Sequence, residues 1–381
     1  MDRQVNYPAV GDIVIFQPEF VEFGGEERVI LSLSRELHAQ GKPHSVLCYW
    51  DHINFSSYAS WPIKVYQLNP GSNPINKILS LRRCINYLRQ TDSPIPVLFN
   101  IQSAYHAGLS VRAPYHLRIP DTYSLLDFKP EGFQEEVLSY LRAAKTKVFG
   151  IVRHIATKRG VRRASKFVTN TIALRNEMYQ LYGSNAEVIY LGGFGGVVQY
   201  APKRPASPIN LFTVSRLQIS KRIDWILHGL AEIKRDAYHY PEWCLHVAGT
   251  GPDLETLQKM TEILGLSKNV IFHGFVSDDK LKDLYEASHI FLMPAKQGFG
   301  LPAIEALYSK LGVVVSDESG VVELLQDTNW ATIAKGGKAD FVSATKEMLL
   351  RVCESNFYEQ PLPDLPTEEL WARKIISHFG W

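Results

Sequence analysis

The sequence lacks several features that would place a protein in a special structural class. It has no run of about 18 apolar residues, so no transmembrane helix is expected. Its four cysteines are widely separated and include no Cys-x-x-Cys pair, which argues against a metal centre or a disulfide framework. Residues Met1–Pro8 lack the apolar core of a signal peptide. We therefore expect a protein of the reducing cytoplasm.

Neither charge nor composition is extreme. The 41 Lys and Arg residues nearly balance the 39 Asp and Glu residues, which leaves a formal net charge of +2. Apolar residues make up 45% of the chain, an ordinary value for a globular enzyme, and this argues against intrinsic disorder. With 381 residues the chain is about twice as long as a typical domain, so two domains are expected.

Short apolar runs alternate with amphipathic helical stretches from one end of the chain to the other. This alternation is typical of parallel α/β units. One such helix is expected over about Glu26–Gln40, followed by Gly41 as its stop signal. The expected strands are Asp12–Phe16, Ser45–Tyr49, Lys64–Gln67, Val97–Asn100, Tyr115–Ile119, Phe167–Asn170 and Val188–Tyr190, and then Asn210–Val214, Leu245–Ala248, Val270–Phe272, Ile290–Met293, Val313–Ser316 and Ala331–Ile333.

The Gly- and Pro-rich segment Leu191–Pro208 separates the two series of strands and is the expected interdomain link. Residues 1–197 would form one Rossmann-like domain and residues 198–365 a second. A final helix, expected over Glu368–Phe379 within residues 366–381, follows a Pro-rich stretch. The other helices expected in the second half are about Trp225–Arg235, Leu254–Leu264, Asp278–Ala287, Ala303–Ser309 and Ala339–Val352.

The most informative segment is the loop between the expected strand Ile290–Met293 and a helix that begins near Pro302. A Gly-rich loop that leads into a helix N-terminus presents backbone N–H groups to an anion. Glu305, one turn inside that helix, is well placed to accept hydrogen bonds from ribose hydroxyls. The loop residues expected at the ligand are Gly298, Phe299, Gly300 and Leu301.

This segment resembles the signature of glycosyltransferase family 4, whose members are retaining enzymes of the GT-B fold. The signature reads Glu, seven residues, Glu; here the second Glu is Glu305, and Gln297 occupies the first position. Gln keeps the length and the acceptor oxygen of Glu but lacks its charge. It cannot stabilise an oxocarbenium-like centre as a carboxylate would. The resemblance implies that Gln297 lies beside the donor sugar and that Glu305 binds the nucleotide ribose.

Other parts of the second half resemble the donor domain of the same family. The run that ends in Ser-Arg-Leu at Arg216, followed by Ser-Lys at Lys221, would supply two cations to a nucleotide diphosphate. Those cations neutralise the pyrophosphate and its departing charge, so no metal and no cofactor is expected. Gly249 begins a Gly-x-Gly-Pro turn near the donor, and the backbone at Val276 would pair with the base edge.

The resemblance is weaker in the first half. The run Gly-Gly-Glu-Glu-Arg that begins with Gly24 and Gly25 would bring a helix N-terminus to the donor phosphate or the acceptor. The family often places a His at the end of the fifth strand, near the reacting sugar. Asp121 falls close to that position here, with Arg118 and His106 as alternatives for the same task.

A basic stretch, Arg142–Lys166, holds nine Lys and Arg residues and no Asp or Glu. Apolar residues among them indicate an amphipathic helix. Two interpretations stay open: a solvated basic face, or contact with an anionic membrane surface or a lipid-pyrophosphate acceptor. No stacking aromatic residues accompany the charges in a recognisable module, so nucleic acid is not expected.

Together these features predict an α/β protein of GT-B type, with two Rossmann-like domains facing across a cleft and the final helix crossing back to the first. The expected reaction is metal-independent transfer of a sugar, with retention, from a nucleotide-diphosphate sugar to a hydroxyl of a glycan, lipid-linked or small-molecule acceptor. Polysaccharide biosynthesis at the inner face of the membrane is the expected setting. The alternatives are a degenerate homologue that only binds nucleotide sugars or a partner subunit, and another GT-B enzyme such as an epimerase or a phosphorylase.

Overall fold

The computed structural model describes residues 7–91, 93–121, 140–193 and 207–381, and of residues 140–148 the backbone alone. The chain divides into two compact units. The first contains the described residues up to Leu191 together with Glu368–Trp381, and the second those of Gly192–Thr367. Most of the expected link Leu191–Pro208, including the expected boundary at 197/198, falls on residues 194–206, outside the described residues.

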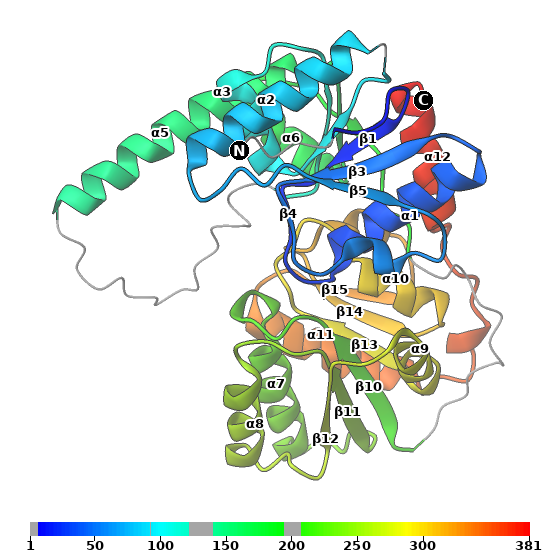
Figure 1. Ribbon diagram of the computed structural model, residues 1–381. Helices are drawn as coiled ribbons and strands as arrows, with labels where there is room; N and C mark the ends of the chain where they lie inside the picture. Colours follow the sequence, from blue (N-terminus) through cyan, green and yellow to red (C-terminus); the bar gives the residue numbers. More distant parts are fainter. Residues whose placement is uncertain (1–6, 92, 122–139, 194–206) are drawn as a thin grey trace. The chain divides into compact units, whose positions relative to one another are not determined.

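The first unit is built on a parallel sheet of seven strands in the order β5-β3-β1-β6-β7-β8-β9 (Figure 1). All four residues of β1 are buried, as expected where helices cover both faces of a parallel sheet. The sheet strands are β1 Ile13–Phe16, β3 His44–Cys48, β5 Lys64–Gln67, β6 Val97–Phe99, β7 His116–Ile119, β8 Lys166–Thr169 and β9 Glu187–Val188; β2 Glu19–Phe20 and β4 Trp50–Asp51 form a separate pair. The α-helices are α1 Gly25–Ala39, α2 Pro74–Gln90, α3 Ile101–Ser110, α5 Tyr140–Arg163, α6 Ile172–Tyr182 and α12 Glu368–Phe379.

The second unit contains a parallel sheet of six strands in the order β12-β11-β10-β13-β14-β15. Its strands are β10 Ile209–Val214, β11 Trp243–Ala248, β12 Val270–Gly274, β13 Ile290–Met293, β14 Gly312–Ser316 and β15 Ala331–Ala334. Its helices are α7 Ile223–Arg235, α8 Leu254–Ile263, α9 Asp278–Ala287, α10 Leu301–Tyr308 and α11 Lys338–Arg351, with the short 3₁₀ helices η2 Ile219–Lys221 and η3 Gly320–Leu324.

Both sheets reverse their strand order at one point, between β1 and β6 in the first unit and between β10 and β13 in the second. In open α/β sheets, ligands bind outside the carboxyl ends of the strands at this switch point, because the connections on either side leave in opposite directions. The loops after these strands are therefore where functional residues are expected in each unit.

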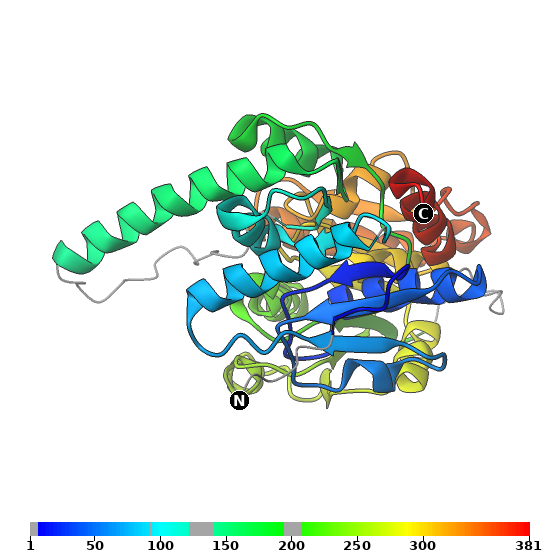
Figure 2. The same cartoon turned by 45° about the horizontal axis from the view of Figure 1, so that its top comes forward.

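Helices α3 and α5 approach each other through small residues. A Cβ added to Gly160 would lie 1.9 Å from the carbonyl oxygen of Ala104, and one added to Gly108 would lie 1.8 Å from that of Ala156. The two backbones can meet this closely only because both positions are glycine. Figures 1 and 2 show that the amino-terminal half of α5 extends beyond α3. None of the described helices is long and apolar enough to span a bilayer.

The final helix α12 belongs to the first unit and packs on α1. Glu368, at its start, pairs with Arg35 and accepts a hydrogen bond of 2.9 Å from the Ser32 hydroxyl. Further along the helix, Arg373 Nε lies 2.9 Å from Glu36 Oε1. Polar contacts of α1 therefore fix the helix, while Trp371 and Ile375 are buried on its inner face.

The α/β fold with two parallel sheets is the one the sequence predicts. Each expected strand agrees with the structure to within two residues at either end, and the final helix has the expected bounds. Helices α2, α3 and α6 and the two-residue strands β2 and β4 were not expected.

Candidate functional site

The loops that follow β10 and β11 lie against each other, main chain to main chain. A Cβ on Gly249, whose φ is +116°, would lie 1.9 Å from the carbonyl oxygen of Ser215, and one on Gly251 would lie 2.2 Å from that of Leu217. The Leu217 N–H also donates to the carbonyl oxygen of Thr250 at 2.8 Å. The Gly-x-Gly turn therefore serves tight loop packing at the switch point, beside the strand end that carries Arg216.

The structure brings Lys221 and Gln297 together from loops 76 positions apart in sequence. Lys221 ends η2, after β10, and Gln297 lies in the loop after β13, the strand that neighbours β10. Lys221 Nζ donates to Gln297 Oε1 at 2.8 Å. Arg216 lies two positions after the end of β10 and is exposed to solvent. Three residues predicted for the diphosphate and the sugar thus come from two adjacent loops.

A third loop, after β14, fixes the position of Gln297. The Gln297 N–H donates to the carbonyl oxygen of Glu318 at 3.2 Å, and the Gly320 N–H donates to that of Gln297 at 3.1 Å. The side-chain amide donates from Nε2 toward Ser319 Oγ at 3.3 Å and toward Met293 Sδ at 2.9 Å. Main chain and side chain of Gln297 are therefore both held in place.

Sequence reasoning missed a charged cluster beside Lys221. Glu318 Oε2 lies 2.5 Å from Arg222 Nη1, and Glu318 Oε1 lies 3.3 Å from Lys296 Nζ. Partial burial alone would raise the pKa of Glu318, but the hydrogen bonds and charges of Arg222 and Lys296 outweigh it and hold that pKa below its usual range. No motif singles out Glu318, which follows β14 and reaches the site only through strand pairing.

Glu305 lies on α10, whose N-terminus follows Gly300 in a left-handed conformation with φ +119°. The buried Tyr285 hydroxyl donates to Glu305 Oε2 at 2.9 Å. This contact orients the carboxylate that the sequence assigns to the ribose. Tyr285 lies on α9, in a segment whose resemblance to the family places it near the nucleotide base.

The remaining loop residues have distinct environments. Phe299 is buried, and its carbonyl oxygen accepts from the Val321 N–H and from the Ser319 hydroxyl, both at 2.8 Å. Gly298 precedes it in the loop, and Leu301 is the first residue of α10. Val276, the expected base contact, is half-buried and follows the largely exposed Phe275 after β12.

In the first unit, two alternatives for the family histidine are placed where they cannot serve. Arg118 is completely buried between the rings of Phe99 and Trp371, and its Nη1 lies 2.5 Å from Glu26 Oε1. It anchors the first turn of α1 to the end of β7, so the expectation that it faces a cleft is wrong.

His106 is also buried, and its Nδ1 lies 3.0 Å from the Tyr49 hydroxyl. Burial, with a smaller effect of the Lys77 charge, lowers the pKa of His106 to about 4, so this ring is a neutral core histidine. A cleft role for His106 is therefore contradicted as well. Asp121 is half-buried, two positions after β7, and stays a candidate.

Gly24 and Gly25 begin α1, and Glu27 caps that helix. Glu27 Oε2 accepts from the Gly24 N–H at 3.0 Å. Burial raises the pKa of Glu27 to about 7, although the backbone N–H bonds of Glu27 and Gly24 oppose the shift. A carboxyl that titrates near neutrality thus sits at the helix start after β1, a property that sequence alone did not indicate.

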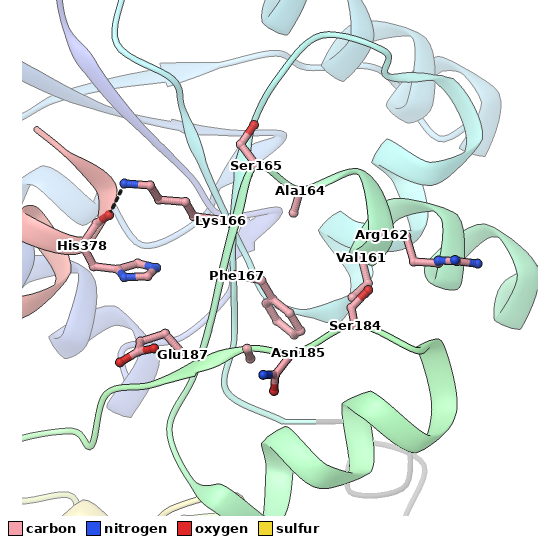
Figure 3. Close-up of a pocket in the computed structure, with 11 residues that line it drawn as sticks. Val161, Arg162, Ala164, Ser165, Lys166, Phe167, Ser184, Asn185, Glu187 and His378 are labelled. Carbon is pink, nitrogen blue, oxygen red and sulfur yellow. Dashed lines mark hydrogen bonds between the residues drawn. The ribbon is translucent and has the colours of Figure 1, made fainter.

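A hollow of about 440 Å³ in the first unit lies elsewhere (Figure 3). It is lined by the start of β8, by the loop before β9 and by His378, whose carbonyl oxygen accepts from Lys166 Nζ. This is the amino edge of the sheet, opposite the strand ends that carry Asp121. None of the residues predicted for the donor site lines this hollow, and neither does Asp121, whereas Arg162 and Lys166 of the basic stretch do.

Comparisons with known proteins identify similar sequences and structures. Residues 201–351 match the family model of the glycosyl transferases group 1. The structure is similar over 97% of its length to the lipopolysaccharide outer core galactosyltransferase WaaB, with a TM-score of 0.69, 17% identity and 99% of that chain covered. It is also similar to Anabaena HepE in complex with UDP, with a TM-score of 0.65, 16% identity and 96% and 95% of the two chains covered.

The fold is that of the GT-B glycosyltransferases. Among curated proteins, a D-inositol 3-phosphate glycosyltransferase of Nocardia farcinica is 27% identical over 217 residues, 52% of this chain and 48% of that protein. A GDP-mannose-dependent phosphatidylinositol monomannoside mannosyltransferase of Mycolicibacterium smegmatis is 28% identical over 145 residues, 36% of this chain and 37% of that protein. The matched part thus spans less than half the length of either relative.

Proposed function

We propose that this GT-B protein is a retaining glycosyltransferase of family 4 that moves a sugar from a nucleotide-diphosphate sugar to an acceptor hydroxyl. The observation that carries the proposal is the contact of Lys221 with Gln297 at the switch point of the second unit. Glu305 lies on α10, the helix that follows the loop of Gln297. These residues lie within the part that matches the group 1 family model.

The proposed roles follow from the chemistry of the side chains. Arg216 and Lys221 hold the diphosphate and neutralise its charge as it departs. Glu305, oriented by Tyr285, accepts hydrogen bonds from the ribose, and Val276 contacts the base. Gly249 and the loop from Gly298 to Leu301 shape the donor site.

The proposed sugar transfer breaks one bond and forms one bond, and it needs no oxidant or reductant. The bond between the anomeric carbon and the diphosphate oxygen breaks, a bond from that carbon to the acceptor oxygen forms on the same face, and the hydroxyl proton passes to the diphosphate. We propose that Asp121 lies on the acceptor side, with the helix start at Gly24 and Gly25. Because two cations already stabilise the leaving group, we propose that the reaction needs no metal.

A panel of nucleotide sugars tests this function. The UDP complex of HepE and the GDP-mannose-dependent relative make UDP- and GDP-sugars the first choices. A true donor should raise the melting temperature by mass action and should release nucleotide diphosphate faster when an acceptor is present, in EDTA as well as in buffer. Donor binding without turnover on any glycan, lipid-linked or small acceptor would favour the alternative of a nucleotide-sugar-binding subunit. Turnover of the donor alone to an isomeric nucleotide sugar would favour an epimerase.

We further propose that the basic helix α5 brings the protein to an anionic membrane surface, as a peripheral protein of the cytoplasmic side. Three aliphatic side chains on its outer face are exposed: Ile151 to 60%, Val152 to 44% and Ile155 to 60%. They share that face with cations one and two turns further on, and a helix with this pattern suits an interface of apolar tails and anionic headgroups. The cations on that face are Lys158, Arg159, Arg162 and Arg163; the side chains of Arg142, Lys145 and Lys147 lie outside the described residues.

Flotation with anionic and neutral liposomes tests this contact. Binding to anionic vesicles should weaken as salt rises, because the charges are screened. It should also weaken in Ile151→Ser/Ile155→Ser, with no change in binding of nucleotide diphosphates. Absence of flotation at low salt would leave a solvated basic face as the explanation.

A further inference from the structure

The side chain of Gln297 lies in a cage of donors and acceptors formed by Lys221, Met293 and Ser319. The arrangement of hydrogen bonds fixes which way the amide points. The Ser319 hydroxyl donates to the carbonyl oxygen of Phe299 at 2.8 Å, and a carbonyl oxygen can only accept. Ser319 Oγ is then left with acceptor capacity toward its other neighbour.

That neighbour, at 3.3 Å, is Nε2 of Gln297, which must donate. The second contact of Nε2 is the Met293 sulfur at 2.9 Å, a weak acceptor that carries no hydrogen. The opposite atom, Oε1, therefore accepts from the Lys221 ammonium at 2.8 Å. Amide orientation is usually inferred from surrounding bonds, and here every partner requires the same orientation.

The cage is also closed sterically. Gly300 has a φ of +119°, and a Cβ there would lie 2.9 Å from Gln297 Nε2, 2.8 Å from Ser319 Oγ and 2.8 Å from the Met293 methyl carbon. The glycine thus allows the loop to fold over the amide.

Resting on the proposed function, we propose that Gln297 is a positioning residue: it holds the Lys221 ammonium toward the diphosphate without neutralising its charge. A carboxylate in this cage would place an anionic oxygen against the lone pairs of Ser319 Oγ and Met293 Sδ. It would also form an ion pair with Lys221 and reduce the positive charge offered to the diphosphate.

A double-mutant cycle tests this role, with UDP and GDP as diphosphate probes and UMP and GMP as controls that lack the second phosphate. Gln297→Leu should weaken binding of the preferred diphosphate about tenfold, the size of one hydrogen bond to a charged group. Binding of the matching monophosphate should change much less. In a Lys221→Met background, Gln297→Leu should have no further effect, because the residue acts through Lys221.

Gln297→Glu separates positioning from a direct contact with the sugar. We expect Gln297→Glu to bind nucleoside diphosphates more weakly than the wild type does. The double variant Gln297→Glu/Ser319→Ala, which removes the opposing hydroxyl, should recover part of that binding. Gln297→Asn, which keeps an amide but cannot reach Lys221, replaces Gln297→Leu if the apolar variant does not fold. An equal loss of diphosphate binding on Gln297→Leu in both Lys221 backgrounds would refute the positioning role of Gln297 but not the proposed function. Tighter diphosphate binding by Gln297→Glu would do the same. A wild-type protein that binds neither UDP nor GDP would refute the proposed function and this role with it.

Discussion

Replacing Glu27 by Gln should remove a pH-dependent loss of stability from the first unit. The carboxyl caps α1 by accepting from the Gly24 N–H at 3.0 Å, and a Gln amide oxygen can accept the same bond. The substitution therefore changes the charge while it preserves the cap. The effect of the substitution on stability should therefore come from ionisation of the Glu27 carboxyl, because burial disfavours the charged form of that group.

The sign follows from the pKa of Glu27, which burial raises from 4.5 to about 7. Between these values the folded protein binds more protons than the unfolded chain, so the free energy of unfolding falls as pH rises. The full stabilisation by the neutral acid is present below about pH 4.5 and is lost above about pH 7. At about 1.4 kcal/mol per pH unit, the difference between the two pKa values sets an upper limit of about 3 kcal/mol. The Glu27→Gln variant has no carboxyl at this position and should carry none of that dependence.

Calorimetric melting of the wild type and of Glu27→Gln from about pH 4.5 to about pH 8.5 measures the effect. The variant should melt close to the wild type at the acid end and progressively higher toward the alkaline end. Glu255→Gln, an exposed first-turn substitution on α8, is the matched control and should show no such trend. A melting difference for Glu27→Gln that is constant across the range would refute the assignment of a neutral buried carboxyl.

Three further outcomes follow from the contacts described. Gly160→Ala should destabilise the protein by about 1–3 kcal/mol in a denaturation assay, because its Cβ would lie 1.9 Å from the carbonyl oxygen of Ala104 in α3. Gly150→Ala, on the same helix but with open space around it, is the control and should be neutral or stabilising in that assay. Arg216→Ala and Lys221→Ala should each weaken nucleoside diphosphate binding by about 1.5–3 kcal/mol in titration calorimetry, and unchanged affinities in both would remove the diphosphate assignment. Glu305→Ala should weaken binding of UDP or GDP but not of the 2′,3′-dideoxy analogue, whereas an equal loss for both would place the carboxylate away from the ribose.

The fold was predictable because local pattern and overall topology agree. The strands of the second unit are short and apolar, and Ile290–Met293 and Gly312–Ser316 are fully buried, whereas β12 and β15 are only partly buried. Helix α9 has its expected bounds, since Ser277 caps it and accepts from the Lys280 N–H at 3.3 Å. Helix α3 was missed because its buried residues include Ser103, His106 and Gly108, which weaken the apolar periodicity.

The candidate site was predictable only as a set of loops. Motif spacing indicates Lys221, Gln297 and Glu305, but it does not indicate their partners, which come from other strands. Glu318 is brought in by the pairing of β13 with β14, and Tyr285 by the packing of α9. Local sequence patterns do not predict such contacts, because these depend on the order of strands in the sheet and on helix packing.

The same limit explains the outcome for Arg118. An arginine at the carboxyl end of a strand is a reasonable candidate for an anion site, which is the reason for proposing that Arg216 binds the diphosphate. In this fold the end of β7 is covered by Trp371 of α12 and faces Glu26 of α1, so the guanidinium is buried between two rings and paired with a carboxylate. Removing one partner would leave a buried charge without compensation, which is far costlier than losing a surface pair. Arg118 is therefore a structural residue because the final helix, from the far end of the chain, covers it. Among the described residues no such helix covers Arg216, which is exposed.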